Sequence, residues 1–131
     1  MTDDDLVEQA RLAREHAYAP YSGFAVGAAV LATDGRVFAG CNVENASYGL
    51  CNCAERTALF SAIAAGVTPG GIERMAVIGG TSDPISPCGA CRQVMFELGG
   101  PELPVVLANL RGDRQHTTAA ALLPGGFRFD T

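Results

Sequence analysis

The stretch FAVGAAVLATDGRVFAGCN, residues 24–42, carries the clearest structural signal in the chain. Its first part, Phe24 to Ala32, is an apolar run whose length and composition are typical of a buried strand. Asp34-Gly35 follows, a dipeptide that strongly favours a hairpin turn. Residues 36–42 are therefore expected to return antiparallel to the first strand.

The segments on either side of this hairpin alternate between helical and strand patterns. Apolar residues at helical spacing predict a helix over residues 3–17, with Thr2 or an early Asp as its N-cap and Pro20 beyond its end. Downstream we expect helices over 53–65, 88–98 and 117–123, strands over 75–79 and 105–108, and polar loops over 43–52 and 81–87. Because the two later strands follow helices, parallel pairing through right-handed crossovers is expected there. The order predicts an α/β fold: a mixed, mostly parallel sheet with an N-terminal antiparallel hairpin, sandwiched between helices, in a single domain over residues 1–131.

Composition excludes several classes of protein. The 131 residues include 14 acidic and 9 basic side chains, a net charge of −5, with no lysine, which disfavours nucleic acid as a partner. Apolar residues make up 48% and charged residues 18%, so an extended disordered chain is not expected. No apolar run is long enough for a membrane span, and the acidic start Thr2-Asp3-Asp4-Asp5 is unlike a secretory signal. We therefore expect a cytoplasmic protein with no membrane partner.

Cysteine spacing indicates a metal site. Two segments, Cys53-Ala54-Glu55 and Pro87-Cys88-Gly89-Ala90-Cys91, fall at predicted helix starts, where free backbone N–H groups favour the thiolate that binds zinc. Cys88 and Cys91 share one helical turn, and Cys53 completes a set of three ligands. Three protein ligands leave a fourth position for water, as in catalytic zinc sites. Glu55 can then accept and deliver that water's proton.

Simpler interpretations of these residues remain open. The Cys-x-x-Cys pair alone is equally typical of a thioredoxin-like redox site, although this leaves Cys53 and Glu55 without a role. A closed structural zinc site would need a fourth ligand, and a glutamate in a first helical turn is commonly a dipole partner. The available fourth ligands for such a closed zinc site are Cys41, Cys51, His16 and His116. Phe24 and Phe127, taken without the other motifs, would be ordinary core residues.

The motifs together resemble the cytidine deaminases, specifically the short homotetrameric class of the zinc-dependent cytidine/deoxycytidylate deaminase family. The Cys-Ala-Glu and Pro-Cys-x-x-Cys elements match the general signature of zinc deaminases, and the Asn-Val-Glu-Asn segment is more specific. The resemblance covers nearly the whole chain in order, and implies a three-layer α/β/α fold. It rests on Pro20 to Ala28, Gly40 to Gly49, Cys53 to Ala58, Pro87 to Gln93, Leu122-Leu123-Pro124 and Phe127.

The resemblance also implies a role for each matching residue. Cys53, Cys88 and Cys91 would bind one zinc per chain, with Glu55 as the proton shuttle. Phe24 would pack on the pyrimidine face, Asn42 and Glu44 would bind the ribose hydroxyls, and the backbone at Ala54 would contact the base edge. Ala46, Tyr48 and Phe127 would complete the site of a neighbouring subunit. Arg56 would hydrogen-bond the sulfurs and draw off their negative charge.

The function implied is hydrolytic deamination of cytidine, and of deoxycytidine, to uridine or deoxyuridine plus ammonia, in pyrimidine salvage. Zinc-bound hydroxide would attack carbon 4 of the ring while Glu55 moves the protons. A related aminohydrolase such as blasticidin S deaminase is the nearest alternative, and a non-enzymatic zinc or redox module is another. The intact segment Asn42-Val43-Glu44-Asn45 favours an enzyme that binds ribose. A polynucleotide deaminase is disfavoured by the acidic charge and the short chain.

Overall fold

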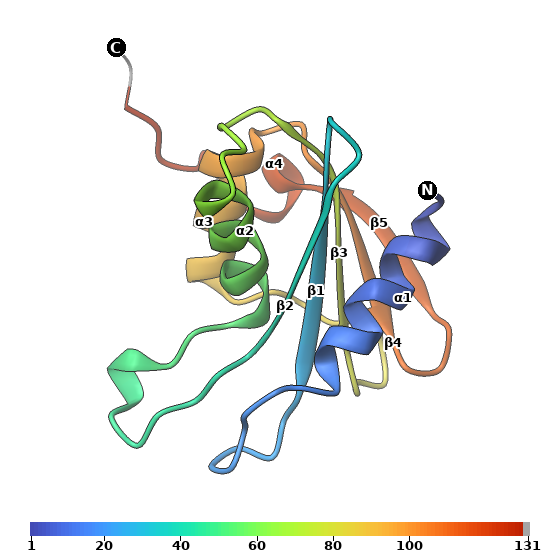
Figure 1. The fold of residues 1–131 in the computed structure, drawn as a ribbon, viewed down its shortest axis with the longest axis vertical. Coiled ribbons are helices and arrows are strands. Elements are labelled where there is room, and N and C mark those ends of the chain that lie inside the picture. The colour runs from blue at the N-terminus through green and yellow to red at the C-terminus, as the bar shows by residue number, and fades with distance from the viewer. Residues whose placement is uncertain (130–131) are drawn as a thin grey trace.

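A five-stranded sheet with strand order β2-β1-β3-β4-β5 separates two layers of helices in the computed structural model, which describes residues 1–129 (Figure 1). The strands are β1 (Val26–Ala32), β2 (Val37–Cys41), β3 (Ile72–Gly79), β4 (Pro104–Asn109) and β5 (Arg114–Thr118). The helices are α1 (Asp3–Arg14), α2 (Ala54–Ala64), α3 (Gly89–Gly99) and α4 (Ala119–Leu122), with a 3-10 turn η1 at Tyr48–Leu50. The three-layer α/β/α arrangement implied by the resemblance is confirmed.

The N-terminal hairpin is also confirmed. β1 and β2 pair antiparallel in a register that places Leu31 opposite Val37. The turn between them uses Gly35 at φ +91°, a left-handed conformation that glycine adopts without strain. Arg36 N donates a hydrogen bond to the Asp34 carboxylate at 3.1 Å, so that the Asp34 side chain stabilises the turn.

The expectation of a mostly parallel sheet is wrong. Only β3 and β4 pair parallel, whereas the pairs β1–β2, β1–β3 and β4–β5 are antiparallel. The chain leaves β2 through α2 and places β3 beside β1 rather than beside β2, so β3 meets a strand that runs the opposite way. Strand β5 was not expected from the sequence, because its residues Arg-Gln-His-Thr-Thr include no apolar side chain. It lies at an edge of the sheet.

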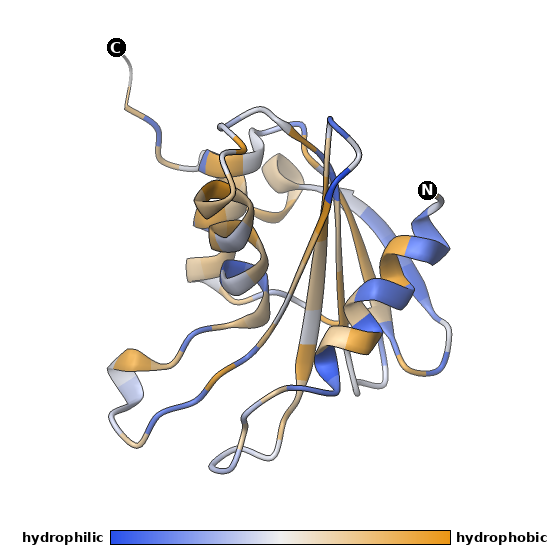
Figure 2. Cartoon of the chain, viewed as in Figure 1, coloured by the Kyte–Doolittle hydropathy of each residue, from blue (hydrophilic) through white to orange (hydrophobic). Residues whose placement is uncertain are grey.

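Both faces of the sheet are covered, which explains why all seven residues of β1 are buried. Ala29 and Leu31 face α1 and pack in one core cluster, while Ala28 and Val30 pack in a second cluster beneath α2 and α3. Figure 2 shows the central strands mainly hydrophobic and α1 alternating between hydrophobic and hydrophilic segments. Within residues 1–129, no helix combines the length and apolar character that crossing a bilayer requires.

The helix ends differ slightly from those expected. α1 has Thr2 as its N-cap, one of the residues that the sequence offers, in a capping box with Asp5, and it ends at Arg14 rather than near residue 17. The Arg14 side chain turns back to the sheet, where its Nε donates to the Ala25 carbonyl at 2.9 Å. Cys53 and Cys88 are the N-caps of α2 and α3, one residue ahead of each helix.

Candidate metal centre and active site

Two helix N-termini bring the predicted cysteines together. The Sγ atoms of Cys53, Cys88 and Cys91 all lie within 4.8 Å of one another. Cys53 Sγ is 3.8 Å from Cys88 Sγ, and Cys88 Sγ is 3.2 Å from Cys91 Sγ. Tetrahedral zinc with Zn–S bonds of about 2.3 Å requires sulfurs about 3.8 Å apart. The Cys53–Cys88 distance matches this value, and a small widening of the Cys88–Cys91 pair lets the three cysteines hold one zinc ion.

This cluster excludes the other candidate ligands. Among residues 1–129, one group of side chains is placed to hold a metal, and it consists of the three cysteines alone. The other possible ligands do not belong to it: Cys41, Cys51, His16 and His116. Residues 1–129 therefore supply no fourth protein ligand that would close the site. Three thiolates instead leave one coordination position open, as in a catalytic site.

Hydrogen bonds around Cys53 stabilise its thiolate. Hydrogen bonding to Cys91, together with donation from Arg56 Nη2 at 3.3 Å, lowers the pKa of Cys53 to about 5. On the other helix, Cys91 N donates to Cys88 Sγ at 3.4 Å. Arg56 thus lies where a guanidinium can withdraw charge from the sulfur it contacts.

Glu55 lies in the first turn of α2, with only 4% of its surface exposed. Burial is the main reason that its pKa is raised above the ordinary range of a glutamate. The side chain lines a cavity of about 240 Å³ together with Cys53 and Cys88. A carboxyl group held there with a raised pKa is suited to accepting and releasing a proton.

Asn42 and Glu44 line the same cavity from the loop after β2. The Asn42 side chain accepts from Val26 N and donates to the Phe24 carbonyl, each at 2.8 Å. Glu44 accepts hydrogen bonds from Tyr21 and Ser22, and the Ser22 hydroxyl is the main reason that the pKa of Glu44 is lowered. The two polar side chains are thereby held in fixed directions at the cavity wall.

The structure brings most of the predicted site residues together. Phe24, Asn42, Glu44, Cys53, Ala54, Glu55 and Cys88 line the one cavity. Phe24 precedes β1 and is 41% exposed, so it is not the ordinary core residue that its pattern alone suggested. Cys91 is buried in the cysteine cluster itself.

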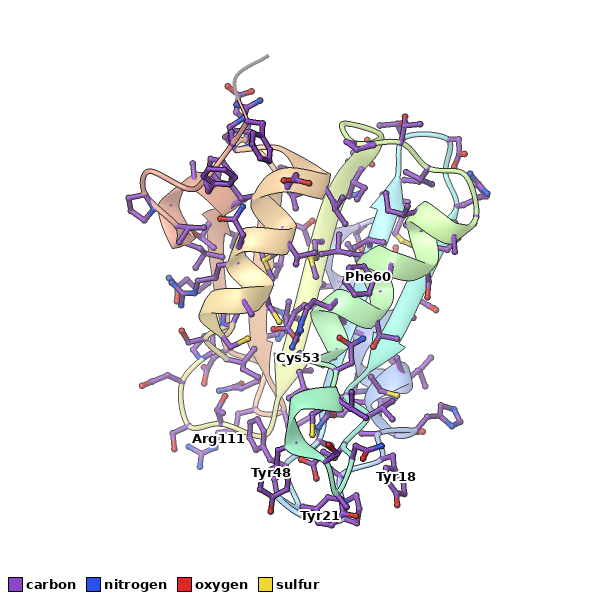
Figure 3. All side chains as sticks on the ribbon, turned by 90° about the vertical axis from the view of Figure 1, so that its left-hand side faces the viewer. Tyr18, Tyr21, Tyr48, Cys53, Phe60 and Arg111 are labelled. Carbon is purple, nitrogen blue, oxygen red and sulfur yellow. The ribbon has the colours of Figure 1, made fainter. Side chains whose placement is uncertain are left out.

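Three predicted residues do not reach this cavity. Ala46, Tyr48 and Phe127 are absent from its lining, and Tyr48 and Phe127 are 74% and 59% exposed. Tyr48 instead lines an adjacent cavity shared with Ser22 and Glu44. In Figure 3, Tyr21 and Tyr48 lie together at the end of the molecule beyond Cys53. Phe127 is tied to α3, since its backbone N and O both bond the Gln93 side chain.

The sequence reasoning missed four residues that line the cavity: Ser22, Val26, Ile85 and Ser86. Ser22 lies within the segment Pro20 to Ala28, and Ser86 directly precedes Pro87. The sequence feature that could have identified these two serines is their position within or next to the matched motifs. Cys41, one of the alternative fourth zinc ligands, is only partly buried and lies outside both core clusters.

Comparisons with known proteins agree with this geometry. Residues 1–107 match the family described as the cytidine and deoxycytidylate deaminase zinc-binding region. A cytidine deaminase from Sporosarcina psychrophila is 51% identical over 127 residues, covering 97% of this chain and 92% of the relative. The crystal structure of cytidine deaminase from Burkholderia pseudomallei superposes with a TM-score of 0.96 at 65% identity, over 97% of this chain and all (100%) of that chain. That of Mycobacterium tuberculosis gives 0.83 at 40% identity, over 98% and 100%. The chain therefore belongs to the zinc-binding cytidine and deoxycytidylate deaminase family.

Proposed function

We propose that this protein is a cytidine deaminase that hydrolyses cytidine, and deoxycytidine, to uridine or deoxyuridine plus ammonia with one zinc per chain. One observation carries the proposal: two members of the cysteine cluster, Cys53 and Cys88, line one cavity with the buried Glu55 and with Asn42 and Glu44. A redox pair needs neither Glu55 nor polar side chains for a sugar. The similarity to curated cytidine deaminases supports the same substrate class.

Bound zinc would lower the pKa of a water molecule enough to supply hydroxide near neutral pH. Glu55 takes the proton released from the attacking water and delivers it to ring nitrogen 3. It then takes the remaining proton from the hydroxyl now bonded to carbon 4 and passes it to the amino group, so that the carbonyl forms as the C–N bond breaks and ammonia leaves. Burial suits Glu55 to this role because it brings the pKa of the carboxyl closer to neutrality.

The remaining residues hold the substrate and adjust the charge of the site. Phe24 packs against the pyrimidine face, the Ala54 backbone contacts the base edge, and Asn42 and Glu44 bind the ribose hydroxyls. Arg56 offsets part of the negative charge of the sulfurs through its bond to Cys53 Sγ. Each group lies at the cavity or at the cysteine cluster, which supports these roles.

The chain acts, in this proposal, as a single domain in a cytoplasmic homotetramer of pyrimidine salvage. Tyr48 and Phe127 expose large aromatic rings and lie outside the cavity of their own chain, which supports a role in a neighbour's site. Light scattering of the purified protein should give about four times the mass of the 13.5 kDa chain. A monomer that turns over cytidine at full rate would contradict the role of Tyr48 and Phe127.

The direct test follows the ultraviolet absorbance of cytidine during incubation with purified protein. We expect conversion to uridine that is lost after chelation and returns when zinc is added back. Blasticidin S and cytosine, tested in parallel, distinguish a nucleoside deaminase from a related aminohydrolase. If folded protein carrying one zinc per chain leaves cytidine unchanged, the proposed function is wrong.

A further inference from the structure

The Glu44 carboxylate is held by three hydrogen-bond donors from one short segment. Tyr21 N and Ser22 N donate to Oε1 at 3.0 and 3.1 Å. The Ser22 hydroxyl donates to the other oxygen, Oε2. The backbone binds one oxygen, and a single side chain binds the other.

The direction of the Ser22 hydroxyl is itself determined by a neighbour. Phe24 N donates to Ser22 Oγ at 3.0 Å, which occupies a lone pair of that oxygen. The hydroxyl hydrogen is then directed to Glu44, so that donation runs from Phe24 through Ser22 to the carboxylate. Gly23, at φ +67° and bonded from its N to the Ala19 carbonyl at 2.9 Å, forms the turn that allows this path.

Counting acceptor positions shows what remains for a ligand. An ionised carboxylate offers about two lone-pair positions on each oxygen. The two backbone N–H groups occupy those of Oε1, and Ser22 occupies one of Oε2. One position of Oε2 is left, and its direction depends on the Ser22 contact. Ser22 and Glu44 also line both the site cavity and the adjacent cavity that contains Tyr48.

We propose that Ser22 is a positioning residue that directs the free acceptor position of Glu44 toward a sugar hydroxyl, and so makes the enzyme select nucleosides that carry that hydroxyl. The inference rests on the proposed function, in which Glu44 binds the ribose. Ser22 touches neither zinc nor the reacting carbon in this scheme. Its removal therefore changes how well a hydroxylated substrate binds, and leaves the chemical step intact.

The first test compares two substrates across three variants. Ser22→Ala should raise the KM for cytidine about tenfold, the effect of losing a charge-assisted hydrogen bond, while kcat stays within about twofold. The kcat/KM for 2′,3′-dideoxycytidine, which lacks both hydroxyls, should not change. Ser22→Thr keeps the hydroxyl and should restore the KM. Ser82→Ala, the same change at an exposed serine of another loop, should match the wild type.

Two outcomes of this first test would overturn the proposal. An equal loss for both substrates would show a general disturbance of the loop, and an unchanged KM for cytidine would show that Ser22 does not direct Glu44. Absence of cytidine turnover in the zinc-loaded wild type would contradict the proposed function and, with it, the selection of nucleosides, whereas the Ser22–Glu44 contact is tested separately by the second experiment.

The second test reads the Ser22–Glu44 contact without turnover, by ¹³C NMR titration of the Glu44 carboxyl. Because the Ser22 hydroxyl lowers the pKa of Glu44, Ser22→Ala should raise it and Ser22→Thr should not. The other titratable side chains that line the two cavities are the same in all variants: Tyr21, Tyr48, Cys51, Cys53, Glu55 and Cys88. An identical titration in wild type and Ser22→Ala would contradict the inference.

Discussion

At the residue scale, two buried polar side chains show how differently such groups can be used. Asn109 is 1% exposed, and its amide is satisfied by the turn around Asp113 and by the Ser82 carbonyl. Glu55 is 4% exposed, but it faces the cavity beside Cys53 and Cys88. Asn109 therefore stabilises a turn, whereas Glu55 is a buried carboxyl group at a cavity wall, the position that its proposed role as proton carrier requires.

Replacing Glu55 by glutamine should separate chemistry from metal binding. Glu55→Gln keeps the side-chain shape and leaves the three sulfurs in place, so zinc content should stay near one per chain. Turnover should fall by about a hundredfold to ten-thousandfold, because the proton carrier is gone. Metal analysis together with the cytidine assay measures both quantities. Glu102→Gln, at an exposed position, is the matched control, and near-normal turnover of Glu55→Gln would refute the role of Glu55.

Removing one sulfur should have the opposite pattern. Cys88→Ala should lose zinc and activity together, because two thiolates cannot hold the metal as three do. Cys41→Ala changes a cysteine outside the cluster and should keep its zinc. The check is the zinc-to-protein ratio after dialysis. Full zinc content in Cys88→Ala would remove this residue from the metal site.

At the element scale, the close approach of β2 to α2 sets the position of Cys53, a proposed metal ligand. A Cβ placed on Gly40 would lie 2.6 Å from Ala58 N and 2.9 Å from the Ala54 carbonyl. Since these are backbone atoms, no rotamer change can relieve the clash. The absence of a side chain at Gly40 thus lets the first turn of α2 lie against the sheet.

Gly40→Ala should therefore push the start of α2 away from β2. We expect a loss of about 1–3 kcal/mol in the free energy of unfolding, the range seen for overpacked cores, together with weaker zinc binding. Urea denaturation and a competitive zinc titration measure the two effects. Gly49→Ala is the control because nothing lies within 4 Å of its Cβ position. Equal stability of the two variants would contradict the tight packing.

At the scale of the whole molecule, carboxylates on several elements make the fold sensitive to acid. Hydrogen bonds lower the pKa values of Asp5 through Thr2, Glu8 through Arg11, Asp34 through Arg36, and Glu44 through Ser22. A carboxyl whose pKa is lower in the folded state stabilises the fold above its unfolded pKa, about 3.9 for Asp and 4.3 for Glu. That stabilisation is lost as the pH falls through the lowered folded values. Glu55 has the opposite sign, because its raised pKa makes ionisation on going to neutral pH unfavourable to the fold.

The free energy of unfolding should accordingly decline as the pH is lowered from about 5 to 3. Urea denaturation at a series of pH values measures the slope. Asp34→Asn removes one contributing carboxyl at the hairpin and should reduce the dependence on pH in this window. A steeper or identical slope in Asp34→Asn would show that the Asp34–Arg36 contact does not contribute.

Much of the fold and of the site was predictable because the signals are local. The turn at Asp34-Gly35 and the helix starts at Cys53 and Cys88 follow from short segments, and the parallel pairing of β3 with β4 follows from the strand–helix–strand order. The antiparallel pairing of β1 with β3 was not predictable. After α2 the chain could place β3 beside β1 or beside β2, and no local sequence signal decides between them. β5 was missed because its side chains are polar.

The sequence alone determined which chemical groups the protein has: three thiols, one nearby carboxylate and two polar side chains in a loop, at spacings that identify the family. Only the tertiary structure decided where these groups point. It joined the two helix N-termini into one cysteine cluster, moved Phe24 from an expected core position to the cavity wall, and placed Ser22 against Glu44. The physical reason is that residue type and spacing specify local structure. Contacts between segments far apart in the chain instead depend on how the helices pack on the sheet.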